Sequence, residues 1–148
     1  MFRPSTRARY ALRAMIELSL REGADPVSLR EIARAQRLSP KYLEQLTIPL
    51  NRAGLVQAER GAAGGYRLAK SPDQITAREI VEAVDAPLYL LDCLRTGEAC
   101  DQAGVCAAQR MWSRVAQAVV SVLSETTLAD LRDEQRAAVA GVAPCYQI

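Results

Sequence analysis

The sequence predicts a mainly α-helical protein with a small β-wing, in which a winged helix-turn-helix domain precedes a long helix suited to dimerisation. Two short helical segments joined by about three residues indicate a helix-turn-helix. Two short apolar runs then flank a glycine-rich tip at 61–65, which predicts a hairpin. The expected division is a winged helix-turn-helix domain at 1–85, a cysteine-containing cluster-binding loop at 86–106, dimerisation helices at 106–140 and a flexible tail at 141–148.

The first helix is predicted from about Ser5 to Arg21, because small or apolar residues recur there at helical spacing. Arginines occupy other positions around this helix. A capping box formed by Ser28 and Glu31 predicts the start of a second, short helix that ends near Gln36. The residues of the first apolar stripe are Ala8, Ala11, Leu12, Met15, Ile16 and Ser19.

The third helix is predicted to begin with Ser39 as its N-cap and Pro40 at its first position. Pro49 lacks a backbone N–H, so a kink or an early end is expected near Ile48. Gly54 is expected to cap the C-terminal end. The inner face of this helix and the two strands of the hairpin are predicted at Leu43, Leu46 and Leu50, and at 55–60 and 66–68.

The C-terminal part of the chain is also predicted to be helical. Thr76 and Glu79 form a second capping box, which starts a helix that ends near Asp85. A long helix is expected at about 106–124, and Thr127 caps a last helix that ends near residue 139. One side of the long helix is apolar, at Met111, Trp112, Val115, Val119, Val122 and Leu123.

Composition excludes several classes of function. The formal net charge is only +2, so any attraction to nucleic acid must come from local clusters of arginine. The chain has no histidine, and its glycine-rich segment matches no phosphate-binding or dinucleotide motif, so we do not expect an enzyme. No apolar run approaches the roughly 18 residues of a membrane span, and no signal peptide is recognisable. A cytoplasmic protein is expected.

Candidate DNA-binding side chains cluster on the third helix and the hairpin. The second helix of a helix-turn-helix enters the major groove, where Lys, Gln, Tyr and Ser can donate to bases or phosphates. Glu44 can accept from a cytosine amino group, and Arg60 can contact a minor groove or a phosphate. A protein-interaction module without an operator is the alternative. The candidates are Ser28, Ser39, Lys41, Tyr42, Glu44, Gln45, Arg60 and Arg67.

Three cysteines, Cys93, Cys100 and Cys106, lie on a polar, glycine-bearing segment, with six and then five residues between them. Three thiolates on one such segment can converge on a soft metal centre, and an iron–sulfur cluster is our main hypothesis. The alternatives are a zinc site, a thiol–disulfide switch and scattered structural cysteines. Cys145, in the tail, is either a further ligand or a stray thiol.

Several motifs together resemble the Rrf2 family of winged-helix transcriptional regulators, which includes iron–sulfur biogenesis regulators, nitric-oxide sensors and iron regulators. The motifs are R-Y-A-L-R-A-M, S-P-K-Y-L-E-Q-L, A-G-L-V, R-G-A-A-G-G-Y-R-L and the cysteines, spread over residues 3–135. The resemblance implies a homodimer on operator DNA, expected to be a repressor that senses iron, redox state or nitric oxide. It assigns cluster ligation to Cys93, Cys100 and Cys106, and the dimer interface to Trp112, Val115, Val119 and Val122.

Two positions depart from the family pattern. Biogenesis regulators use a histidine three residues after the last cysteine, where this chain has Gln109. Nitric-oxide sensors can use an aspartate from the partner's first helix, where this chain has Arg9. The wide first cysteine spacing is closer to the nitric-oxide and iron sensors, which favours a 4Fe–4S cluster with an unusual fourth ligand. A 2Fe–2S cluster is the alternative, and a cluster carrier without an operator is a rival of another class.

Overall fold

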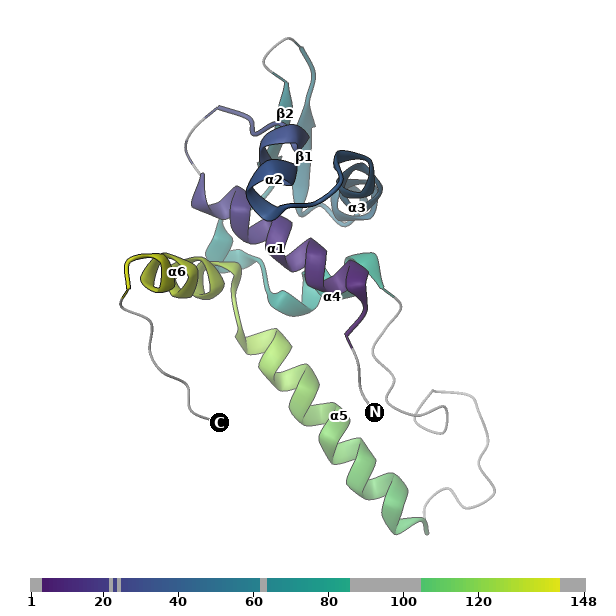
Figure 1. The fold of residues 1–148 in the computed structure, drawn as a ribbon. Helices are drawn as coiled ribbons and strands as arrows, with labels where there is room; N and C mark the ends of the chain where they lie inside the picture. The colour runs from purple at the N-terminus through teal and green to yellow at the C-terminus, as the bar shows by residue number, and fades with distance from the viewer. Residues whose placement is uncertain (1–3, 22, 24, 62–63, 86–104, 142–148) are drawn as a thin grey trace.

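The computed structural model describes residues 4–21, 23, 25–61, 64–85 and 105–141. In this part of the chain the predicted helices and hairpin occur in the predicted order, around one hydrophobic core (Figure 1). The predicted fold class is therefore confirmed. The elements are α1 (Thr6–Leu20), α2 (Leu29–Gln36), α3 (Pro40–Arg52), β1 (Val56–Glu59), β2 (Gly65–Leu68), a short 3₁₀ helix η1 (Pro72–Gln74), α4 (Ala77–Val84), α5 (Ala107–Glu125) and α6 (Leu128–Val139).

Helix α1 lies at the centre of the domain and contacts α2, α3, α4, α6 and the wing (Figure 1). Ser5 caps it, because its hydroxyl accepts the backbone N–H of Ala8 at 2.9 Å. The predicted stripe faces the core, and neighbouring positions are buried as well. A helix with neighbours on several sides needs a broad apolar face. Its buried residues are Ala8, Ala11, Ala14, Met15, Glu17, Leu18 and Ser19.

The starts of α2 and α3 agree with the prediction, with Ser39 at the N-cap and Pro40 at the first position of α3, whereas the expected early end of α3 is wrong. Ser39 occupies the N-cap position of α3, but its side chain makes no capping hydrogen bond. Ser39 is exposed, so water can accept hydrogen bonds from the backbone amides of the first turn of α3. The helix does not end near Ile48 but continues through Pro49 to Arg52. Pro49 removes one backbone hydrogen bond, while Leu46 and Leu50 are both buried and hold the helix to the core on either side.

The hairpin is an antiparallel pair that carries a short third segment along its edge. Val27 exchanges two backbone hydrogen bonds with Tyr66, at 3.0 and 2.8 Å, so the segment before α2 pairs with β2. Gly65 is needed at this crossing, because a Cβ there would lie 2.5 Å from the Val27 carbonyl oxygen. Gly54 adopts a φ of 69° after α3, where the predicted C-terminal cap lies. The wing is thus fixed to the start of α2 as well as to the end of α3.

The C-terminal helices contact the domain through α6 against α1 and α5 against α4, and backbone hydrogen bonds fix the junction between them. The backbone N–H of Ala77 donates to the Thr126 carbonyl at 2.9 Å, and that of Leu128 donates to the Ile75 carbonyl at 2.7 Å. The side chain of Leu128 is fully buried, and it is the one buried residue of α6. Helix α5 has none, and it extends away from the domain (Figure 1). Leu128 is therefore the apolar anchor of this junction.

We expect Leu128→Ala to lower the free energy of unfolding by about 2–4 kcal/mol, because the substitution leaves a cavity beneath the junction. The measurement is a urea or thermal unfolding curve. Val139→Ala is the matched control, since Val139 also lies on α6 but is 80% exposed, and it should change stability by less than about 0.5 kcal/mol. Equal curves for the two variants would show that the junction does not depend on Leu128.

Candidate nucleic-acid interface and cysteine site

Helix α3 presents one polar face to solvent and one apolar face to the core. Lys41, Glu44 and Gln45 are exposed, and their spacing of three and four residues places them on one side of the helix. The opposite side packs inward through Leu43, Leu46 and Leu50, each at most 1% exposed. Three of the predicted DNA-binding side chains are thus brought together on the outer surface of this helix.

Tyr42 differs from its neighbours on α3, because its ring packs inward. It is half-buried and meets the ring of Tyr10 edge-to-face, with centroids 5.8 Å apart. The guanidinium groups of Arg9 and Arg13 lie 5.7 and 5.5 Å from the centroid of Tyr10. Tyr42 therefore joins the first turn of α3 to α1, a role that sequence analysis did not assign to it.

Arg13 also holds the turn between α2 and α3. Its guanidinium donates to the Gln36 carbonyl at 2.6 Å and to the Gln36 side chain at 3.0 Å. Gln36 in turn donates to Glu17 at 3.0 Å. The next residue, Arg37, takes a left-handed conformation with a φ of 52°. Sequence analysis missed this arrangement, since Arg13 and Gln36 lie 23 positions apart and no local pattern links them.

The two predicted serines have different surroundings. The Ser28 hydroxyl donates to the Glu31 carboxylate at 2.7 Å and accepts the backbone N–H of Glu31. This hydrogen bond and that of the Ser28 backbone lower the pKa of Glu31. The hydroxyl of Ser28 is therefore occupied within the α2 cap. Ser39 has no such side-chain bond at the start of α3, so its hydroxyl can donate to a phosphate.

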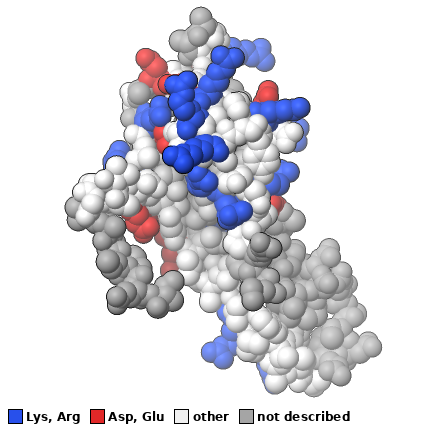
Figure 2. All heavy atoms as spheres, in the orientation of Figure 1, with Lys and Arg blue, Asp and Glu red and all other residues white. Residues whose placement is uncertain are grey.

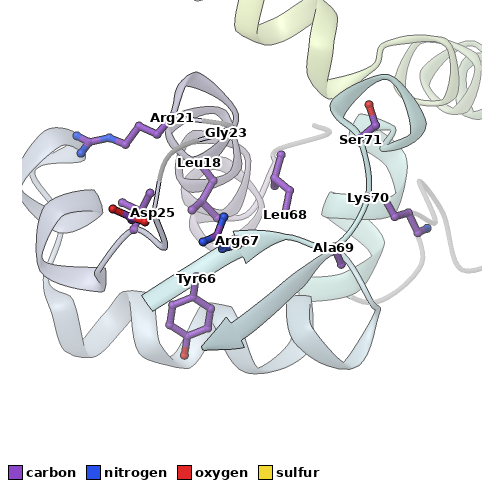
Figure 3. A pocket seen from close by; sticks show the side chains of 11 residues that line it. Leu18, Arg21, Gly23, Asp25, Tyr66, Arg67, Leu68, Ala69, Lys70 and Ser71 are labelled. Carbon is purple, nitrogen blue, oxygen red and sulfur yellow. The ribbon is translucent and has the colours of Figure 1, made fainter. Parts of the chain in front are cut away.

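The two wing arginines point to different environments. Arg60 follows β1 and is exposed. Arg67 forms an ion pair with Glu59 and lines a hollow of about 320 Å³ between β2 and the end of α1, together with Leu18 and Asp25 (Figure 3). The Tyr66 ring lies on the other side of the strand in this view. Arg60 is therefore better placed than Arg67 to contact DNA.

Basic side chains gather over the helix-turn-helix. Figure 2 shows Lys and Arg concentrated over the upper part of the molecule, where Asp and Glu are few. Of the three acids on α1, α2 and α3, Glu17 is buried beside Arg21 at 2.8 Å, Glu31 is held in its cap, and Glu44 is exposed. The local charge is therefore positive although the net charge is small. The exposed basic residues of α1, α2, α3 and the turn are Arg7, Arg9, Arg13, Arg30, Arg34, Arg37, Lys41 and Arg52.

Cys106 is the N-cap of α5. Its sulfur accepts the backbone N–H of Gln109 at 3.4 Å, the residue is half-buried, and the thiol is free. The positive end of the helix dipole lies here, which is compatible with a metal-bound thiolate. Cys93, Cys100 and Cys145 lie outside the described residues. The residues that are described include no group of three metal-ligating side chains.

The apolar stripe of α5 is largely uncovered. Trp112, Val115 and Val122 are 41%, 37% and 62% exposed. Val119 is instead half-buried, and with Leu123 it lines a small apolar crevice against α1 and α4. Three of the four predicted interface residues thus remain available to a partner. No helix in the described ranges is long and apolar enough to cross a membrane.

Comparison with known proteins agrees with this architecture. The family model Rrf2, described as an iron-dependent transcriptional regulator, matches residues 4–134. The regulator CymR of Bacillus subtilis is 44% identical over 127 residues, which are 86% of this chain and 87% of CymR. The regulator IscR of Cereibacter sphaeroides is 38% identical over 141 residues, with 89% and 88% covered.

Solved structures give the same result. The structure of CymR, the global cysteine regulator of B. subtilis, has a TM-score of 0.75 at 42% identity and covers 90% of this chain and 98% of its own. The structure of T. potens IscR has a TM-score of 0.74 at 34% identity, with 98% and 95% covered. These relatives are transcriptional regulators, so the expectation that the chain is not an enzyme is confirmed. The chain belongs to the Rrf2 family of winged-helix, DNA-binding transcriptional regulators.

Proposed function

We propose that the protein is a homodimeric repressor that binds operator DNA and changes its affinity through an iron–sulfur cluster held by Cys93, Cys100 and Cys106. The observation that carries this proposal is the position of Cys106. It is the last of the three cysteines and also the N-cap of the uncovered helix α5. A group bound there would act directly on the helix that pairs two DNA-binding domains.

The DNA-binding part of the proposal rests on α3 and the wing. With α3 in the major groove, the exposed Lys41, Glu44 and Gln45 would face base edges, and Ser39 would face a phosphate. Arg60 would reach the neighbouring minor groove or its phosphates. Tyr42 would act mainly by holding α3 against Tyr10. The positive surface of α1 and α2 would attract the flanking backbone.

The dimer in this proposal forms through α5. Burying a valine or larger apolar side chain contributes about 1.5–3 kcal/mol, and Trp112, Val115 and Val122 are all available. Two copies joined in this way would carry two recognition helices, which suits an operator with two half-sites. The domain boundaries at 85, 106 and 140 follow from the same division between DNA-binding and pairing elements.

The donor set fits a cluster in its chemistry. Three thiolates suit iron–sulfur clusters, and the described one, at Cys106, is free and held at a helix N-terminus. A bound cluster would supply a centre that responds to iron supply, oxygen or nitric oxide. Gln109 contributes its backbone N–H to the Cys106 sulfur. The spacing of the cysteines favours 4Fe–4S over 2Fe–2S, with a fourth ligand other than Gln109 or Arg9.

A thiol-based regulator on the same scaffold is the second candidate. It is favoured by the similarity to CymR, whose structure is described as that of a global cysteine regulator. Cys106 is a free, half-buried thiol at a helix N-terminus, and such positions favour reactive cysteines. A zinc site is a variant of this candidate. The candidates differ in whether protein purified without oxygen contains iron and sulfide.

Cys106→Ser is expected to remove the broad absorption near 400 nm and the bound iron and sulfide of protein purified without oxygen. Serine is itself a good N-cap, so α5 should persist while the thiolate is lost. Cys145→Ser distinguishes the two interpretations of that residue: an unchanged spectrum makes Cys145 a stray thiol, and an altered spectrum makes it a further ligand. If wild-type protein is colourless and also resists anaerobic reconstitution with iron and sulfide, the cluster is excluded and the thiol or zinc candidate takes its place.

Arg60→Ala is expected to weaken binding to an operator, selected from a random duplex pool, by about three- to tenfold. The slope of log affinity against log salt concentration should also decrease by about one, as expected for the loss of one phosphate contact. Arg67→Ala should have a smaller effect, because Glu59 already neutralises that side chain. Arg136→Ala, on α6, removes the same charge away from α3 and the wing and serves as the control. The wing assignment is wrong if Arg60→Ala and Arg136→Ala bind the operator equally.

Val122→Glu should convert the dimer into monomers, because it places a charge within the proposed apolar contact. Sedimentation velocity measures the change in mass. Gln117→Glu introduces the same charge on the other side of α5, where Gln117 is exposed, and should leave the mass unchanged. A Val122→Glu protein that remains dimeric would place the interface elsewhere.

A further inference from the structure

Ile48 is an exposed apolar residue on the DNA-binding half of the protein. It is 51% exposed, on α3. The other exposed large apolar side chains of the described residues all lie after residue 104, on or beside α5 and α6. Pairing of two copies through these helices would cover several of them. They are Val105, Met111, Trp112, Val115, Val122 and Val139. Dimerisation through α5 therefore leaves Ile48 unexplained.

The position of Ile48 relates it to the residues that would contact bases. It follows Lys41, Glu44 and Gln45 by seven, four and three positions, so all four share one face of α3. The neighbouring Thr47 is 5% exposed and belongs to the inner side. Ile48 thus continues the line of exposed side chains along the helix by one further turn.

Ile48 also borders a groove between α3 and the wing. The groove holds about 250 Å³ and is lined by Thr47, Ile48, Asn51, Arg52, Ala58 and Tyr66. Its inner wall is tied together by the hydroxyls of Thr47 and Tyr66, 3.3 Å apart, and by the Asn51 amide, which donates to the Val56 carbonyl at 3.2 Å. Arg52, which also lines the groove, is exposed and can bind a phosphate.

The chemistry of the major groove identifies what an apolar side chain can contact there. Base edges present hydrogen-bonding atoms throughout, and the one apolar group among them is the 5-methyl of thymine. We propose that Ile48 is a specificity-determining residue that packs against a thymine methyl group in each operator half-site. This inference rests on the proposed operator binding and adds to it one base preference at the C-terminal side of the Lys41, Glu44 and Gln45 contacts.

The test removes the thymine 5-methyl group and the Ile48 side chain, first one at a time and then both together. An operator is selected from a random duplex pool with the wild-type dimer, and each thymine is replaced in turn by deoxyuridine. We expect one symmetric pair of thymines whose replacement weakens wild-type binding by about three- to tenfold. Ile48→Ala should weaken binding to the unmodified operator by a similar factor and abolish the penalty of deoxyuridine at that pair only.

Two further variants make the result specific. Ile48→Val keeps a branched apolar side chain and should retain most of the deoxyuridine penalty, whereas Val139→Ala should leave the whole pattern unchanged. Ile48 is exposed, so the unfolding midpoint of Ile48→Ala should stay close to that of the wild type. Equal deoxyuridine penalties in wild-type and Ile48→Ala protein at every thymine would overturn the assignment of Ile48 while operator binding stands. Failure to enrich any duplex would overturn operator binding itself, and with it this inference.

Discussion

The close packing of α1 against its neighbours is the constraint on which the rest of the domain depends. Ala8, Ala11 and Ala14 are at most 5% exposed, and their short side chains allow the surrounding backbones to approach α1. Larger residues at such positions would strain the core by about 1–3 kcal/mol each. The same helix turns Arg9 and Arg13 outward onto the ring of Tyr10, and so onto the first turn of α3. One element therefore sets the core spacing and also positions α3.

Local sequence signals predicted most of the helix starts, because a capping box depends on two residues three positions apart. Ser28, Thr76 and Thr127 all cap their helices with complete capping boxes. The prediction of an early end for α3 failed because tertiary packing outweighed a local preference. Pro49 disfavours a helix interior, yet the buried Leu46 on one side of it and Leu50 on the other keep that turn helical. Sequence periodicity shows which side chains turn inward but not how strongly the core holds them.

The candidate site divides in the same way. The exposure of Lys41, Glu44 and Gln45 follows from helical periodicity, so these positions could be predicted from sequence. The ion pair of Arg67 with Glu59 depends on the register of the hairpin, and the contact of Tyr42 with Tyr10 depends on how α3 crosses α1. These two pairs lie 8 and 32 positions apart, and no local pattern encodes either one. Only the tertiary structure therefore distinguishes the exposed side chains, such as Lys41, from side chains that hold α3 or the wing in place, such as Tyr42.

Helix α5 has a different relation to the domain from every other helix. None of its side chains is buried, and the Ile75–Leu128 junction lies just beyond its C-terminal end. Covering the exposed parts of Trp112 and Val122 would contribute a share of the about 1.5–3 kcal/mol that full burial of such a side chain brings, so a partner copy would stabilise this helix. Cys106, at the other end, does not belong to the hydrophobic core around α1. In the proposed dimer, a change at Cys106 would therefore act on the spacing of the two domains and leave the core of each one in place.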